Sequence, residues 1–133
     1  MKITPYLSFN GNCAAAFDFY KELLKGEIAF KMTWGESPAA AEMPPEAASL
    51  VMHSTLIIGD VTLMGADAIP GTYEQPKGIN VSLQVEEVTE GTGIFNQLAD
   101  QGSITMPFQP TFWSKGFGMC VDRFGIPWMI SCE

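Results

Sequence analysis

The chain has 133 residues, of which 47% are hydrophobic, enough for the core of one domain. Its three cysteines are odd in number and lack Cys-x-x-Cys spacing, which argues against a disulfide framework or a zinc ribbon and favours a reducing, cytoplasmic compartment. A formal net charge of −8 repels the phosphates of nucleic acid. Neither an apolar run of about 20 residues nor a signal peptide is present, so we expect an unexported protein without a membrane partner.

The first third of the chain predicts a strand, a helix and a second strand. Residues 3–9 are strand-like, and the Asn-Gly-Asn that follows can end the strand and cap a helix. The helix is indicated by apolar side chains at helical spacing, and Gly26 is placed to stop it. These side chains are Cys13, Phe17, Tyr20 and Leu24. Residues 27–34 then predict a strand.

The next segment, residues 36–49, is rich in alanine and proline and predicts a loop. Such a loop is either a lid or a tolerated insertion. Residues 50–58 and 61–66 follow as the two strands of a hairpin that turns at Gly59 and Asp60.

Residues 68–77 predict a linker, after which the pattern begins again. Residues 79–85 alternate apolar and polar side chains as a strand does, and residues 88–101 predict a helix despite two internal glycines. Three further strands are expected, at residues 104–108, 117–121 and 127–131. Asp122 and Gly125 supply the turn between the last two.

The order strand, helix, three strands therefore occurs twice, with the helices about 75 residues apart, which indicates an internal duplication. We expect an α+β domain spanning residues 1–133, with repeats at 1–67 and 78–133. The two repeats would form curved mixed sheets around a cleft. One helix cannot cover both faces of a sheet, so the repeats are expected to pack together or against a second chain, as in a homodimer.

The chain resembles the PhnB-like proteins of the vicinal oxygen chelate superfamily, which includes glyoxalase I, bleomycin-resistance proteins and extradiol dioxygenases. The resemblance runs through nearly the whole chain in the same order. It rests on Thr4-Pro5-Tyr6-Leu7-Ser8-Phe9-Asn10-Gly11-Asn12-Cys13-Ala14, Phe19-Tyr20, His53, Ile58-Gly59-Asp60, Leu63-Met64, Asp67-Ala68, Phe112-Trp113, Gly116-Phe117-Gly118, Asp122 and Phe124-Gly125-x-Pro127-Trp128-Met129-Ile130.

The resemblance implies where a divalent metal would be held, on the first and last strands of each repeat. The corresponding side chains are Pro5 or Tyr6, Leu63 or Met64, Asn80, and Met129. These are no plausible ligand set for a hard metal ion, so we expect no metal and no cofactor. No glycine-rich site for a methyl-donor nucleotide follows a strand, so methyl transfer finds no support either.

His53 is the only histidine and the one candidate for catalysis. Alternation along its strand places it on the same side as Val51, Thr55 and Ile57. Two readings stay open: a core or interface histidine with satisfied hydrogen bonds, or a general base or polar anchor in a pocket. No Gly-x-Ser-x-Gly elbow accompanies it, and Gly116-Phe117-Gly118 lacks a dinucleotide fingerprint.

Aromatic side chains gather in the second repeat, where they either fill the core or line a pocket for a planar or apolar ligand. Trp113 and Lys115 lie on a connection and are the best candidates for ligand contact. Cys13, on the apolar stripe, is read as a buried structural thiol. The predicted ligand pocket consists of Tyr6, His53, Asn80, Trp113, Lys115 and Phe117.

The function that these observations favour is binding of a small molecule in a metal-free cleft, as in the bleomycin-resistance branch. The alternative is an enzyme that acts on a small molecule by acid-base chemistry with His53 or with an atypically bound divalent metal. A dimeric scaffold without a ligand is a third possibility.

Overall fold

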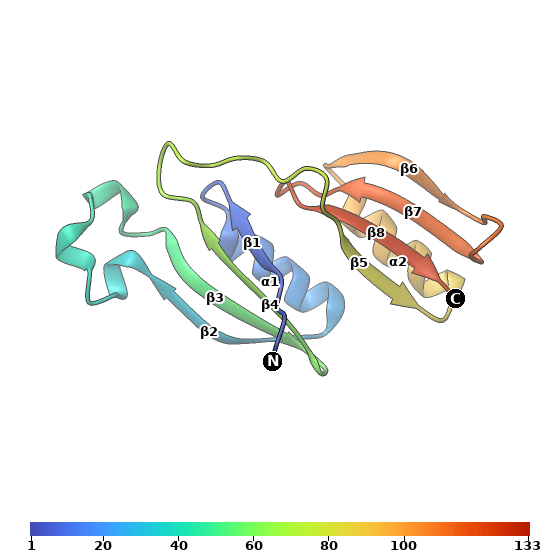
Figure 1. Ribbon diagram of the computed structural model, residues 1–133, viewed down its shortest axis with the longest axis horizontal. Helices are drawn as coiled ribbons and strands as arrows, with labels where there is room; N and C mark the ends of the chain where they lie inside the picture. The colour runs from blue at the N-terminus through green and yellow to red at the C-terminus, as the bar shows by residue number, and fades with distance from the viewer. The chain divides into compact units, whose positions relative to one another are not determined.

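The computed structural model describes residues 1–133 as two compact units, Met1–Glu74 and Gln75–Glu133. Each unit contains one helix and one four-stranded mixed sheet, in the order strand, helix, three strands (Figure 1). The α+β class and the repeated βαβββ order predicted from the sequence are therefore confirmed. The boundary between the units lies inside the predicted linker.

The first unit is built on a sheet with the strand order β1-β4-β3-β2, called sheet A here. β1 runs parallel to β4, and the other neighbours are antiparallel. The helix α1 lies between β1 and β2 in the chain. The elements are β1 (Tyr6–Phe9), α1 (Cys13–Leu24), β2 (Glu27–Thr33), β3 (Val51–Ile58) and β4 (Val61–Asp67).

The second unit repeats this plan in sheet B, with the order β5-β8-β7-β6. β5 pairs in parallel with β8, while β7 pairs antiparallel with β6 and β8. The elements are β5 (Val81–Val85), α2 (Val88–Ala99), β6 (Ser103–Gln109), β7 (Gly116–Val121) and β8 (Pro127–Cys132).

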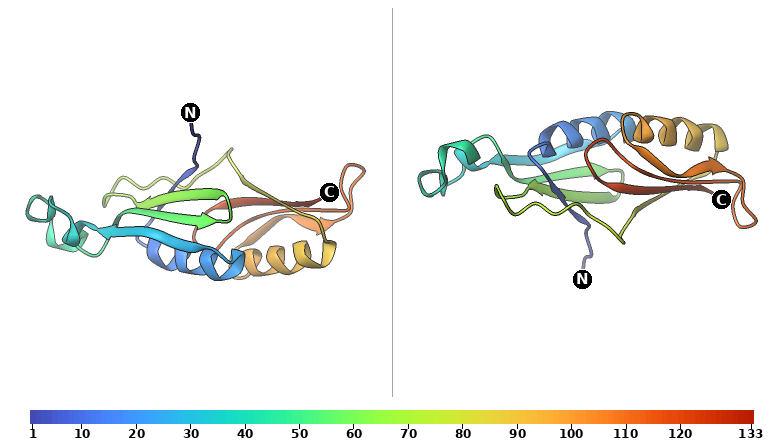
Figure 2. Two further views of the ribbon diagram at one scale, coloured as in Figure 1. Left: turned by 90° about the horizontal axis from the view of Figure 1, so that it is seen from below. Right: turned by 90° about the horizontal axis from the view of Figure 1, so that it is seen from above.

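The predicted apolar stripe of α1 packs on one face of sheet A. Phe17 and Tyr20 are completely buried, and burial of each large side chain contributes about 1.5 to 3 kcal/mol. A Cβ on Gly65 of β4 would come within 2.9 Å of the Phe17 ring, so this glycine lets the helix approach the sheet. In each unit the helix covers one face of its sheet and leaves the other uncovered by a helix (Figure 2).

The helix α1 ends just before Gly26, as predicted, and Gly26 donates its backbone N–H to the Lys21 carbonyl, but the left-handed residue is Lys25. Lys25 takes the left-handed conformation at the C-cap, with φ 57°, and donates its backbone N–H to the Lys21 carbonyl. Gly26 is needed for a different reason: a Cβ there would lie 2.7 Å from the Ile57 carbonyl oxygen. The glycine thus permits a close chain approach rather than a left-handed turn.

Gly91 has a similar role in α2, where a glycine weakens the helix. A Cβ at this position would meet the Cys132 sulfur of β8 at 2.6 Å. The glycine lowers the intrinsic helix propensity of α2 but allows the helix to pack closely on the sheet.

The predicted turn between β7 and β8 is confirmed. Gly125, with φ 93°, donates its backbone N–H to the Asp122 carbonyl at 3.0 Å. The buried Asp122 carboxylate accepts the backbone N–H groups of Phe124 and Ile126. It also accepts the indole N–H of Trp128 at 2.8 Å, so the fully buried Trp128 belongs to the core.

Two predicted strands are shorter than expected at their beginnings. Residues 3–5 lie outside β1, which begins at Tyr6 because Pro5 has no N–H to donate. Ile79 lies outside β5 and is 76% exposed. The alternation of apolar and polar residues therefore begins before the first residue that pairs with a neighbouring strand.

The segment between β2 and β3 contains three 3-10 turns, η1 (Trp34–Glu36), η2 (Ala40–Glu42) and η3 (Pro45–Ala47). The first turn begins with a capping box, in which Thr33 and Glu36 exchange side-chain and backbone hydrogen bonds. The segment extends beyond the ends of β2 and β3 (Figure 1). A lid function stays a prediction.

The two units place different side chains at the corresponding end of their parallel strand pairs. Phe9 of β1 pairs with Asp67 of β4, and Val85 of β5 pairs with Cys132 of β8. A helix begins a few residues after the first strand of each unit.

Neither helix has the length and apolarity required to cross a membrane.

Candidate functional site

A row of side chains crosses sheet A on the face opposite α1. The register pairs Phe30 with Thr55, Thr55 with Met64, and Met64 with Tyr6. Directly opposed residues share a face, and neighbouring residues along a strand point to opposite faces. Since the adjacent Gly65 faces Phe17 of α1, this row lies on the helix-free side. We call these four residues and His53 the open face of sheet A.

Three polar side chains on this face form a hydrogen-bonded chain. The Tyr6 hydroxyl lies 2.8 Å from Nδ1 of His53, and Nε2 of His53 lies 3.0 Å from the Thr55 hydroxyl. The imidazole is therefore satisfied at both nitrogens. Tyr6 is 54% exposed, which leaves the phenol oxygen as the member of the chain that a bound molecule can reach.

The proton arrangement of this chain has two forms, set by the tautomer of His53. Either the phenol donates to Nδ1 and Nε2–H donates to Thr55, or Thr55 donates to Nε2 and Nδ1–H donates to the phenol oxygen. Burial raises the pKa of the Tyr6 phenol, so it stays protonated near neutrality. In the second form the phenol proton is free to bind a ligand. The site can thus act as a donor or an acceptor.

Aromatic surface surrounds this polar chain. The Phe30 ring is 45% exposed and its centroid lies 5.9 Å from that of His53, while the Tyr6 and His53 rings are 5.5 Å apart. Apolar walls with a few directed polar groups are typical of small-molecule sites.

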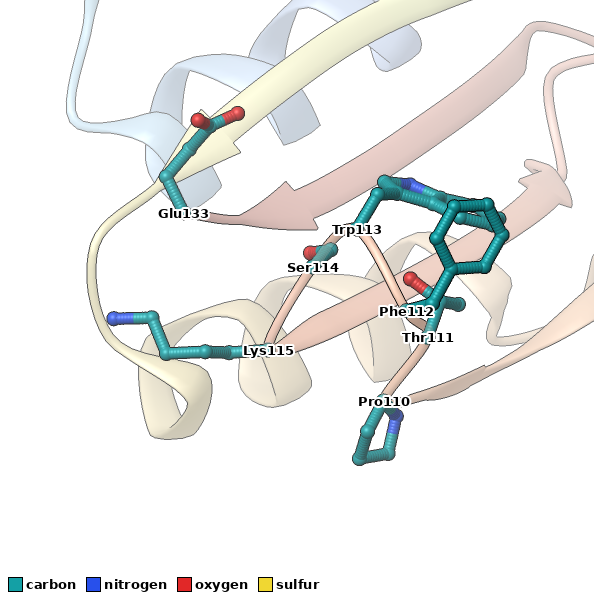
Figure 3. A pocket seen from close by; sticks show the side chains of 7 residues that line it. All are labelled: Pro110, Thr111, Phe112, Trp113, Ser114, Lys115 and Glu133. Carbon is teal, nitrogen blue, oxygen red and sulfur yellow. The ribbon is translucent and has the colours of Figure 1, made fainter.

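The second unit has a hollow of about 450 Å³ at the connection between β6 and β7. Its aromatic wall consists of Phe112 and Trp113, whose rings meet edge to face at a centroid distance of 4.7 Å. The ring of Phe117 supports Trp113 at 5.4 Å. The hollow is lined by Pro110, Thr111, Phe112, Trp113, Ser114, Lys115 and Glu133 (Figure 3).

Backbone hydrogen bonds hold this connection in place. Thr111 donates its N–H to the Ser114 carbonyl at 3.0 Å, and Lys115 donates to the Cys132 carbonyl at 3.1 Å. The Ser114 hydroxyl lies within 2.7 Å of the carbonyl oxygens of both Gly116 and Cys132. The aromatic pair is therefore presented from a fixed backbone.

The structure brings together two groups of the predicted pocket residues. Tyr6 contacts His53 in the first unit, and Trp113 contacts Phe117 and shares the hollow with Lys115 in the second. Asn80 precedes β5 and is exposed, and its place in a pocket stays a prediction. Thr55 and Glu133 were not among the predicted pocket residues. The two-residue spacing from His53 was the signal that pointed to Thr55.

The residues on the helix-free faces do not suit a hard divalent cation. Tyr6 pairs with Met64 in sheet A, and the corresponding pair in sheet B is Ser82 with Met129. Phenol, thioether and neutral hydroxyl groups are poor ligands for such an ion. Among residues 1–133, no three His, Cys, Asp or Glu side chains gather in a way that could hold a metal.

The cysteines are buried and unpaired. Burial, reinforced by Asp67, raises the pKa of the Cys13 thiol to about 12. Burial next to Asp122 raises the pKa of Cys120 to about 11. These thiols are held in the unreactive protonated form, in agreement with the structural role predicted for Cys13.

Two βαβββ units with mixed sheets are the fold of the vicinal oxygen chelate superfamily. The fosfomycin resistance protein FosX from Listeria monocytogenes, solved with Mn(II) and 1S,2S-dihydroxypropylphosphonic acid, matches over 100% of this chain and 92% of its own, with a TM-score of 0.69. At 7% identity this similarity concerns the fold alone.

Similarity in sequence is more specific. A family model described as 3-demethylubiquinone-9 3-methyltransferase matches residues 1–131. The protein YjdN from Escherichia coli K12 is 36% identical over 98% of this chain and 95% of its own length. The chain belongs to this family, the PhnB-like proteins of the vicinal oxygen chelate superfamily.

Two solved structures extend the comparison. Protein PA1353 from Pseudomonas aeruginosa is 42% identical, with a TM-score of 0.92 over 100% of this chain and 98% of its own. A PhnB protein from Bacillus cereus is 26% identical, with a TM-score of 0.85 over the whole of both chains.

Proposed function

We propose that the chain binds a small molecule on the open face of sheet A, with Tyr6 and His53 as polar anchors. The observation that carries this proposal is the Tyr6–His53–Thr55 hydrogen-bonded chain, which ends in a half-exposed phenol. Asn80, Trp113, Lys115 and Phe117 are also proposed as ligand contacts, within the second unit. No metal takes part in this binding.

The aromatic side chains on this face expose apolar surface to water, which is unfavourable in free energy. Phe30 and Tyr6 are both large aromatic side chains with about half of their surface exposed. Covering such rings with an apolar ligand contributes about 25 cal/mol per Å² of surface removed from water. A directed hydrogen bond from the phenol adds about 0.5 to 1.5 kcal/mol and fixes the ligand's orientation.

A fragment screen by protein-detected NMR tests this proposal. Compounds that shift signals of Tyr6 and His53 are expected to lose about threefold to tenfold in affinity in Tyr6→Phe, which removes one hydrogen bond. Tyr73→Phe serves as the matched control. Finding no such compounds, or finding that Tyr6→Phe and His53→Ala bind them unchanged, would contradict the proposal.

The second candidate is an enzyme that uses the same residues for acid-base chemistry. It is favoured by the direct contact of a protonated phenol with an imidazole, which together can relay a proton. Incubating the screened compounds with the protein and following them by NMR distinguishes the two functions. Product formation that His53→Ala abolishes supports the enzyme, while unchanged compounds support binding alone.

We also propose a homodimer in a reducing, cytoplasmic compartment. The dimer is supported by the sheet face that each helix leaves uncovered, and the compartment by three unpaired thiols. Light scattering at micromolar concentration is expected to give the mass of two chains, and a monomer would contradict the dimer.

A further inference from the structure

The hollow between β6 and β7 belongs to the second unit and differs chemically from the open face of sheet A. Phe112 is 97% exposed and Trp113 is 57% exposed, although both are large aromatic residues. Exposed apolar surface of this kind, on a backbone fixed by hydrogen bonds, is typical of binding sites. The fixed backbone also reduces the ordering cost of binding.

The charged groups lie apart from the aromatic pair. Figure 3 shows Lys115 and Glu133 on one side of the hollow and the rings of Phe112 and Trp113 on the other. The Lys115 ammonium forms no salt bridge within the chain, unlike Arg123, which pairs with Asp100. The chain has a net charge of −8, so an unpaired ammonium group gives this hollow a local positive charge. That charge favours binding of an anionic group.

Uncommitted hydrogen-bonding groups complete the site. No hydrogen bond engages the Trp113 indole N–H, and the Thr111 hydroxyl oxygen is enclosed without a partner. The Glu133 carboxylate on the same side as Lys115 repels a second negative charge. The hollow therefore combines an aromatic surface, one free cation and one carboxylate.

From this arrangement we infer that the hollow binds an aryl ring joined to a single carboxylate, with the ring against Phe112 and Trp113 and the carboxylate at Lys115. This inference deepens the proposed small-molecule binding and rests on it. It adds the ligand class and a site independent of Tyr6 and His53.

The test uses benzoate, phenylacetate and 3-phenylpropionate, each compared with its uncharged amide. Binding is read from the Trp113 indole signal in NMR titrations, which Trp113→Phe assigns among the three tryptophans. At least one carboxylate is expected to bind about twofold to fivefold more tightly than its amide, as for an exposed ion pair. Lys115→Met should remove this preference, whereas Lys77→Met, a matched exposed lysine in the same unit, should not.

Equal binding of every acid and its amide would overturn the inference, as would a preference that persists in Lys115→Met. Phe112→Ala is expected to weaken both members of a pair, because the ring contact is shared. If Tyr6→Phe removes the preference and Lys115→Met does not, the carboxylate binds sheet A, which overturns this inference but leaves the proposed function intact.

Discussion

The carboxylate of Asp67 accepts the backbone N–H of Cys13 at 2.9 Å, so the last residue of β4 caps the first residue of α1. Its other oxygen accepts the Val51 N–H at 2.8 Å. Asn12, at the N-cap position itself, makes no side-chain capping bond. One buried carboxylate thus joins the helix to two strands of sheet A.

Asp67→Asn is expected to lower the free energy of unfolding by about 1.5 to 3 kcal/mol, the value of hydrogen bonds to a buried charged group. The amide can accept only one of the two N–H groups without turning its own NH₂ toward the other. Urea denaturation measures the change. Asp60→Asn, in the exposed β3–β4 turn, is the control and should stay within about 0.5 kcal/mol; equal effects of the two variants would refute the capping role.

Alkaline pH should destabilise the protein through its buried thiols. The thiol of an unfolded cysteine has a pKa of about 8.5, whereas burial raises the pKa of the Cys13 thiol in the folded protein to about 12. At pH values below the pKa of the unfolded thiol, Cys13 is protonated in both states, so its ionisation does not lower the free energy of unfolding. Above that pKa only the unfolded chain releases the proton, so stability is lost progressively between about pH 8.5 and 12.

Urea midpoints measured from pH 7 to 11 test this expectation. Cys13→Ala should show a shallower decline than the wild type, because one of the titrating thiols is gone. A decline of the same slope in both proteins would show that Cys13 does not cause it.

Alkylation of the native protein at pH 8 should also be slow, because its thiols are buried and protonated. All three thiols should react after unfolding.

Substitutions at the end of α1 should have opposite effects at two adjacent positions. Lys25→Gly is expected to stabilise by about 0.5 to 1 kcal/mol, because the left-handed conformation costs a lysine more than a glycine. Gly26→Ala should destabilise by about 1 to 3 kcal/mol by forcing a Cβ against the Ile57 carbonyl. Thermal melts measure both, and stabilisation by Gly26→Ala would contradict the close approach.

The indole of Trp128 and the carboxylate of Asp122 should be energetically coupled. A double-mutant cycle with Asp122→Asn and Trp128→Phe isolates their hydrogen bond from the other contacts of each residue. We expect a coupling of about 1 to 2 kcal/mol for this buried, charge-assisted bond. The pair Asp100 and Arg123, exposed and 3.4 Å apart, provides a comparison that should couple by less than about 1 kcal/mol.

Regular periodicity explains why much of the fold could be predicted. The apolar stripe of α1 and the turn at Asp122 and Gly125 are local patterns with local causes, and both are present. The close approach at Gly26 was not predicted because its cause, the carbonyl of Ile57, lies in a distant strand. The start of β5 was misjudged because apolar and polar residues alternate beyond the residues that have pairing partners.

The candidate site was predictable only in part for the same reason. Alternation put His53 and Thr55 on one side of a strand, but their link to Tyr6 depends on the parallel pairing of β1 with β4. The hollow beside Trp113 includes Glu133, twenty residues further along, because β8 returns next to β7. No single stretch of sequence contains that neighbour relationship.

The corresponding positions Asp67 and Cys132 join helix and sheet differently in the two units. The Cys132 thiol lies 3.6 Å from the Glu87 carbonyl at the start of α2, where the first unit uses a carboxylate. The carboxylate accepts two backbone N–H groups, from Cys13 and Val51, whereas the thiol makes one weak contact with a carbonyl oxygen. The same position therefore joins helix and sheet through a charged group in the first unit and through close packing against Gly91 in the second.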